Sequence, residues 1–170
     1  MRGRLKCGNI HMNDPEVVRA LLQVVAQAAR DNANHHRLRV RGAYYFELPD
    51  GPCRSEGGWY AILSDQGAPL YIGQADDLNK RLNSKDGTRD DFANPKRKFD
   101  GKRNFIKALS SIGFLPELRV VTISESQVAS RLGVRQPLAK LDRDNVEKAL
   151  SMCRGLIKWI PPGPSALSAA

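Results

Sequence analysis

Two short apolar runs, Gly58-Trp59-Tyr60-Ala61-Ile62-Leu63 and Pro69-Leu70-Tyr71-Ile72-Gly73, decide the fold of this 170-residue chain. Both runs are rich in aromatic and β-branched residues, and the turn residues Asp65-Gln66-Gly67 separate them. Short adjacent strands joined by such a turn are typical of an antiparallel hairpin. Pairing of the two strands would bring the phenols of Tyr60 and Tyr71 to one site.

The segments after the hairpin carry clear helix and strand signals. Asp76 or Asp77 is placed to cap a helix that contains Leu78, Arg81 and Leu82. Farther along the chain, the sequence predicts a strand, Leu118–Ile123, and helices over Asn104–Ile112, Glu125–Leu132 and from Asp144 to about Ile160.

The segments before the hairpin predict a helix and an extended stretch. Asp14 is placed to cap a helix, Pro15 suits its first position, and apolar residues recur at helical spacing to about Arg30. Leu38–Leu48 is rich in strand-forming residues and ends at the turn Pro49-Asp50-Gly51-Pro52.

These signals predict an α+β fold with a small, three-stranded, mainly antiparallel sheet flanked by helices. Its strands would be Trp59–Leu63, Leu70–Gly73 and Leu118–Ile123. We expect an N-terminal helical arm over 1–41, a core over 42–160 with a basic insertion at about 84–107, and a flexible tail over 161–170.

The hairpin and the helix after it resemble the GIY-YIG nuclease superfamily. Gly58-Trp59-Tyr60 and Tyr71-Ile72-Gly73 lie ten residues apart, and the following helix supplies a leucine and an arginine, Leu78 and Arg81. The resemblance is specific over 58–82 and looser to about residue 162. It implies a GIY-YIG-like fold and a Mg²⁺- or Mn²⁺-dependent endonuclease that hydrolyses DNA phosphodiester bonds, of a stand-alone restriction-type or DNA-processing kind.

The resemblance also implies roles for individual residues. Tyr60 would be the general base or water activator, Tyr71 would assist it, and Arg81 would bind the phosphate. Many family members have a histidine or tyrosine four residues after the arginine, whereas this chain has Lys85, whose charge could stabilise a phosphate. The structural alternatives are that both tyrosines are half-buried strand aromatics and that Arg81 pairs with Asp77.

The family places a metal-binding glutamate on a late helix, and Val146-Glu147-Lys148-Ala149-Leu150 resembles that segment. Glu147 is therefore the expected metal ligand and a catalytic residue. In another interpretation, Asp144 and Glu147 form a capping box at a helix start. A different register would put Cys153 in place of the glutamate, and Glu125 is a third candidate.

Charge points to a nucleic-acid partner. The chain has 27 basic and 18 acidic residues, a formal net charge of +9, and Leu78–Lys107 contains ten of the basic residues but only four acidic ones. Such an excess attracts polyanions, and aromatic and amide side chains are interspersed with it. The residues expected to contact DNA are Arg89, Lys96, Arg97, Lys98, Lys102, Arg103 and Lys107.

Several classes of protein are disfavoured. No run of eighteen apolar residues exists, so no membrane span is expected. Three scattered cysteines without a C-x-x-C pair suit a reducing cytoplasm and argue against a zinc site.

Two other functions stay open: a GIY-YIG-like nucleic-acid-binding module that has lost cleavage, and a basic RNA-binding protein. A two-fold homodimer is expected if the protein cuts both strands at a palindrome. The nuclease hypothesis requires that Tyr60, Tyr71, Arg81 and Glu147 converge on one pocket and that neither ring turns into the interior.

Overall fold

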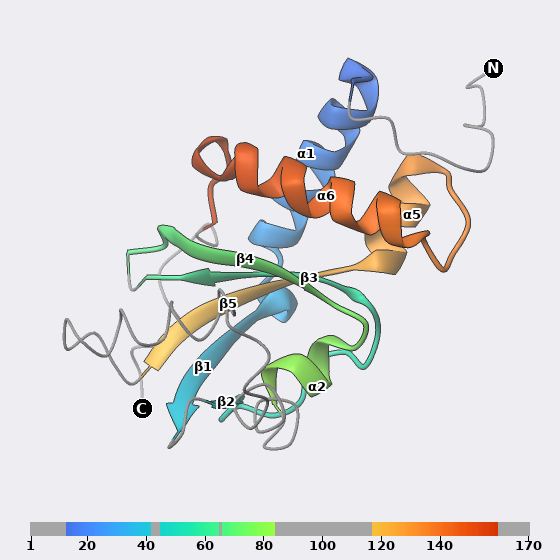
Figure 1. Cartoon of the computed structure of the whole chain (residues 1–170). Helices are drawn as coiled ribbons and strands as arrows, with labels where there is room; N and C mark the ends of the chain where they lie inside the picture. Colours follow the sequence, from blue (N-terminus) through green and yellow to red (C-terminus); the bar gives the residue numbers. More distant parts are fainter. Residues whose placement is uncertain (1–12, 42–44, 65, 84–116, 160–170) are drawn as a thin grey trace, which may run out of the picture.

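The computed structural model describes residues 13–41, 45–64, 66–83 and 117–159, which form one sheet with helices on both faces (Figure 1). The strands are β1 (His35–Arg41), β2 (Tyr45–Glu47), β3 (Gly58–Leu63), β4 (Pro69–Ala75) and β5 (Glu117–Ser124). The helices are α1 (Pro15–Arg30), α2 (Leu78–Leu82), α5 (Glu125–Leu132) and α6 (Lys140–Met152), with 3₁₀ turns η1 (Asn32–Asn34) and η2 (Arg154–Leu156). The predicted α+β class is confirmed.

The sheet is antiparallel throughout, with the strand order β2-β1-β5-β3-β4. The predicted hairpin forms between β3 and β4, and the predicted third strand, β5, pairs with the other side of β3. The predicted count of three strands is wrong, because His35 to Arg39 pair with β5 and β2 pairs with β1. The pairing with β1 satisfies the backbone N–H and C=O groups along the second edge of β5, which a three-stranded sheet would leave unpaired.

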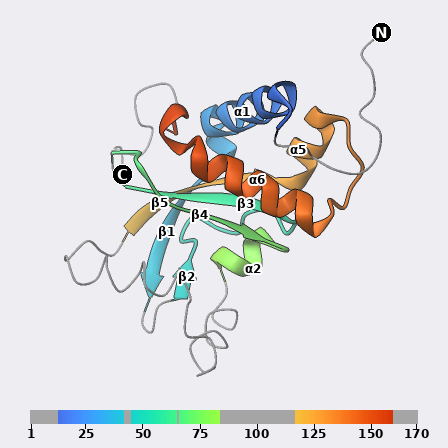
Figure 2. The same cartoon turned by 45° about the horizontal axis from the view of Figure 1, so that its top comes forward.

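Alternating side chains divide the sheet into two apolar layers. Trp59, Ala61 and Leu63 of β3 pack with α1, α5 and α6, whereas Tyr60 and Ile62 pack with α2 and with apolar residues of β1. Figure 2 shows α1, α5 and α6 on one side of the sheet and α2 on the other. The site residues expected on β3 and α2 therefore belong to the layer that contains α2.

The helix expected near the N-terminus is confirmed and is part of the main core. Asp14 accepts a hydrogen bond from the Glu16 N–H at 2.9 Å, and Pro15 occupies the first turn. Leu21 and Val25 are fully buried in the layer that also holds Trp59. The range expected as an N-terminal arm thus contributes a helix and a strand to the same body.

Helix α6 starts four residues earlier and ends earlier than the sequence predicted. It begins at Lys140 after Ala139, which makes no side-chain capping bond, and it ends at Met152, three residues before Gly155. Glu147 therefore lies in the interior of the helix, and the capping-box interpretation of Asp144 and Glu147 is wrong.

Three other expectations concern residues outside the described ranges: the helix at 104–112, the basic insertion at 84–107 and the tail at 161–170. Within the described ranges, no helix has the length and apolar character needed to cross a bilayer.

Candidate active site at the β3–β4 hairpin

The two glycines of the hairpin motif lie where any side chain would collide with the structure. A Cβ atom on Gly58 would run into the backbone carbonyl oxygen of Ile123 on the neighbouring strand β5. A Cβ atom on Gly73 would lie 2.7 Å from the Tyr60 hydroxyl oxygen and 2.8 Å from Cε1 of Tyr71. Gly58 is therefore required by strand packing, and Gly73 leaves the space that the two tyrosine rings occupy.

Tyr60 and Tyr71 meet above Gly73. The register places Tyr60 opposite Gly73, and the two ring centroids lie 6.1 Å apart with the planes tilted by 31°. Because β4 is the outermost strand on this side, a ring that lies over Gly73 extends from β3 toward the open edge of the sheet. The hairpin thus brings the two phenols together, as the spacing predicted.

The ring of Tyr60 is turned into the interior, contrary to the requirement that both rings stay open. Its side chain is 2% exposed and packs with Leu78 and Leu82 of α2. Burial, the most important cause, and a side-chain hydrogen bond with Tyr71 both raise the pKa of Tyr60, so its hydroxyl stays protonated at neutral pH. Tyr71 is only half-buried and is the more accessible of the two phenols.

Arg81 reaches the same place from α2. Asp77 caps this short helix by accepting a hydrogen bond from the Lys80 N–H at 2.9 Å, and the ion pair between Asp77 and Arg81 considered from the sequence is not among the ion pairs of the described residues. The positive charge of Arg81 acts on Tyr60 and lowers the pKa of its hydroxyl, against the larger effect of burial. The guanidinium of Arg81 is therefore within electrostatic reach of the Tyr60 hydroxyl.

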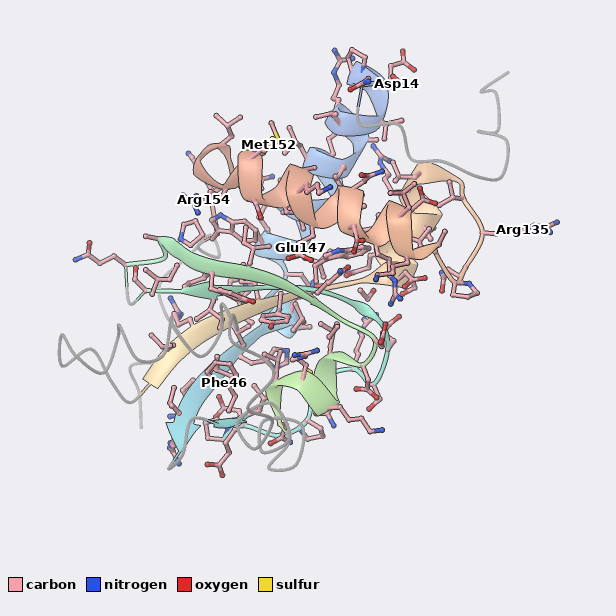
Figure 3. The ribbon with its side chains drawn as sticks, in the orientation of Figure 1. Asp14, Phe46, Arg135, Glu147, Met152 and Arg154 are labelled. Atoms are coloured by element: carbon pink, nitrogen blue, oxygen red, sulfur yellow. The ribbon has the colours of Figure 1, made fainter. Side chains whose placement is uncertain are left out.

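Glu147 approaches from the opposite layer. Helix α6 packs against β4, and Figure 3 shows Glu147 between this helix and the strand. The carboxylate charge of Glu147 acts on the Tyr60 hydroxyl and raises its pKa. Four elements, β3, β4, α2 and α6, thus bring the two phenols, a guanidinium and a carboxylate within electrostatic reach.

The electrostatic surroundings of Glu147 suit a bound cation. Burial raises the pKa of its carboxyl group, and the negative charge of Asp144 raises it further. None of the ion pairs among the described residues includes Glu147. A divalent cation would relieve both effects, and Mg²⁺ binds through one or two carboxylates with water and phosphate oxygens as its other ligands.

The other candidate metal ligands lie in different surroundings. Glu125 is buried at the start of α5, where its carboxylate accepts a hydrogen bond from the Leu138 N–H, and Cys153 follows the last turn of α6. Among the described residues, no group of three or more histidine, cysteine, aspartate or glutamate side chains is arranged to hold a metal. A site built on Glu147 would therefore be sparse in protein ligands.

Several predicted site residues lie outside the described ranges, and their roles stay predictions. They are Lys85 and the expected DNA-contacting residues Arg89, Lys96, Arg97, Lys98, Lys102, Arg103 and Lys107.

Two neighbours of the site were not predicted from the sequence. Gln74 follows the hairpin motif on β4 and donates a 2.6 Å hydrogen bond from Nε2 to Oδ1 of Asp144 on α6. Seventy residues separate the two, and no local pattern signals such a pair.

In comparisons with known proteins, no family model, curated protein or solved structure matched this chain.

Proposed function

We propose that this protein is a metal-dependent endonuclease of the GIY-YIG type that hydrolyses phosphodiester bonds in DNA. The observation that supports the proposal is the meeting of the Tyr60 and Tyr71 rings above Gly73, where the charges of Arg81 and Glu147 also act on the Tyr60 hydroxyl. Phosphodiester hydrolysis needs an activated water, positive charge at the phosphate oxygens and a means of stabilising the leaving group. These four side chains could supply the first two.

We assign the contact with water to Tyr71 rather than to Tyr60. Tyr60 is buried and protonated, and its hydroxyl is hydrogen-bonded to Tyr71. Tyr71 is only half-buried, so its oxygen is the one that an attacking water can approach. In its ionised form, Tyr71 would accept a proton from the attacking water as the new oxygen–phosphorus bond forms and the bond to the leaving sugar oxygen breaks.

Arg81 and Glu147 would serve the phosphate. The guanidinium can donate two parallel hydrogen bonds to non-bridging phosphate oxygens. Glu147 would hold the Mg²⁺ or Mn²⁺ ion, which when bound supplies positive charge that stabilises the reacting phosphate. The net charge of +9 and the basic residues of 84–107 support DNA as the substrate.

Nicking of supercoiled plasmid tests the proposal. Wild-type protein should convert supercoiled plasmid to the open circle with Mg²⁺ and should leave it intact with EDTA. Tyr71→Phe, Arg81→Ala and Glu147→Ala should each slow nicking by roughly 10²- to 10⁴-fold. The matched controls Arg135→Ala and Glu16→Ala remove the same charges from exposed positions and should nick at the wild-type rate.

A DNA-binding protein without cleavage is the second candidate, and the burial of Tyr60 favours it. Fluorescence anisotropy with labelled DNA and RNA duplexes separates the two functions. Binding of DNA with a strong salt dependence, together with an intact plasmid in Mg²⁺ and in Mn²⁺, would replace the enzyme with the binding module. Preference for the RNA duplex would instead indicate an RNA-binding protein.

A further inference from the structure

Three polar contacts hold the first half of α6 against the β3–β4 hairpin. Trp59 donates a hydrogen bond from Nε1 to the backbone oxygen of Arg143 at 3.2 Å, and the Arg143 guanidinium pairs with Asp76. The third contact is the 2.6 Å hydrogen bond from Gln74 to Asp144. Together they fix the helix on one face of the hairpin.

Of the three, the Gln74–Asp144 bond lies nearest in the chain to Glu147. Asp144 precedes Glu147 by three residues, so the two side chains lie about one turn apart on neighbouring parts of the helix surface. Their proximity is also evident because the charge of Asp144 acts on Glu147. Any rotation or slide of α6 that breaks this bond would therefore move Glu147 as well.

Gln74 also belongs to the strand that carries Tyr71. The two residues are three positions apart on β4, with Tyr71 packing in the α2 layer and Gln74 bonding to the helix in the other layer. The single strand β4 thus contacts both halves of the proposed site.

Two buried polar atoms at the interface around Gln74 lack a hydrogen-bond partner in the described part of the chain. The second polar atom of the amide, Oε1, is buried without a hydrogen-bond partner in the described part of the chain, and so is Nε of Arg143. Loss of the Nε2 bond would leave Asp144 without this donor and the Gln74 amide without its hydrogen bond to α6.

We infer that Gln74 is a positioning residue of the proposed site, holding α6 through Asp144 so that Glu147 keeps its place between α6 and β4 (Figure 3). The inference rests on the proposed nuclease function. Gln74 does not contact the reacting atoms. It fixes the placement of the carboxylate, and small displacements of catalytic groups are costly to the rate.

A polarity-swapped pair tests the inference. Gln74→Glu places a second carboxylate beside Asp144 and should break the contact, whereas Gln74→Glu combined with Asp144→Asn restores one donor and one acceptor in reversed order. Gln74→Ala removes the contact altogether. Gln23→Ala is the matched control. It deletes the 2.6 Å hydrogen bond that Oε1 of Gln23 on α1 accepts from Arg131 on α5, away from the site.

Two readouts separate the outcomes. Urea unfolding measures whether Gln74 and Asp144 are coupled in the folded protein. The double variant should lose less unfolding free energy than the sum of the losses caused by Gln74→Glu alone and Asp144→Asn alone. Plasmid nicking measures the effect on the site: Gln74→Ala and Gln74→Glu should lower kcat roughly 10- to 100-fold with little change in KM. The double variant should recover most of the rate, and Gln23→Ala should keep it.

Two results would overturn the inference while leaving the nuclease proposal intact. One is a Gln74→Ala protein that nicks like Gln23→Ala, and the other is an absence of coupling in the urea data. If the wild type itself fails to nick while coupling is present, the proposed function fails and the positioning role fails with it.

Discussion

Replacement of Gly73 by alanine probes the packing that brings the two tyrosines together. A Cβ atom at this position would lie 2.7 Å from the Tyr60 hydroxyl oxygen, 2.8 Å from Cζ of the same ring and 2.8 Å from Cε1 of Tyr71. Real Cβ atoms essentially never approach other heavy atoms this closely. The Tyr60 ring cannot easily yield, because it is 2% exposed and enclosed by apolar side chains.

The expected cost follows from these contacts. Inserting a methyl group into a packed core typically costs about 1–3 kcal/mol, and contact with two rings at once places Gly73→Ala near the upper end. Inside a strand, alanine stabilises the folded state by roughly 0.5–1 kcal/mol relative to glycine, because the unfolded chain with alanine has less conformational entropy to lose. We therefore expect the free energy of unfolding to fall by about 2 kcal/mol.

Urea unfolding followed by circular dichroism measures this change. Gly155→Ala is the control, since no atom lies within 4 Å of its added Cβ, and it should change the unfolding free energy by less than about 0.5 kcal/mol. In a Tyr60→Leu background the contacts with the Tyr60 ring are gone and only the contact with the half-buried Tyr71 ring remains, so Gly73→Ala should cost less than it does in the wild-type background. Equal stability of Gly73→Ala and Gly155→Ala in the wild-type background would refute the packing described here.

Three further predictions concern titrating groups. Burial and Asp144 raise the pKa of Glu147, so Glu147→Gln should raise the urea midpoint at pH 7 although it slows nicking, and this gain in stability should disappear below pH 4.5. Burial raises the pKa of Cys53 to about 11, so alkylation of this thiol by iodoacetamide at pH 8 should be far slower in the folded protein than after unfolding in urea. Burial lowers the pKa of both His35 and His36, so these residues bind protons more readily in the unfolded chain than in the folded protein. The free energy of unfolding should therefore fall as the pH drops below 6.5. This fall should be smaller in a variant with glutamine at both positions.

Local signals in the sequence predicted much of the fold. The hairpin follows from the spacing of two apolar runs, α1 begins at the residues that Asp14 and Pro15 indicate, and α5 spans Glu125–Leu132 as expected. Each of these elements is specified by residues within a few positions of one another. Capping and turn residues therefore sufficed to place them.

Long-range pairing accounts for what the sequence could not predict. The addition of β1 to the sheet depends on the free edge of β5, some eighty residues away, and the start of α6 at Lys140 has no capping side chain to mark it. For the candidate site, the sequence predicted the meeting of Tyr60 and Tyr71 on the hairpin. It did not predict that the Tyr60 ring points inward or that Gln74 holds Asp144, because both depend on packing between layers.

The central claim is that groups from opposite layers of the sheet act on one phosphate. It is tested most directly by single-turnover nicking rates of Arg81→Ala, Glu147→Ala and the double variant in Mg²⁺. If the two residues serve one transition state, the double variant should be about as slow as the slower single variant, because the effects of groups that act as a unit are far from additive. Rate losses that multiply in the double variant, or a single variant that keeps the wild-type rate, would contradict the claim.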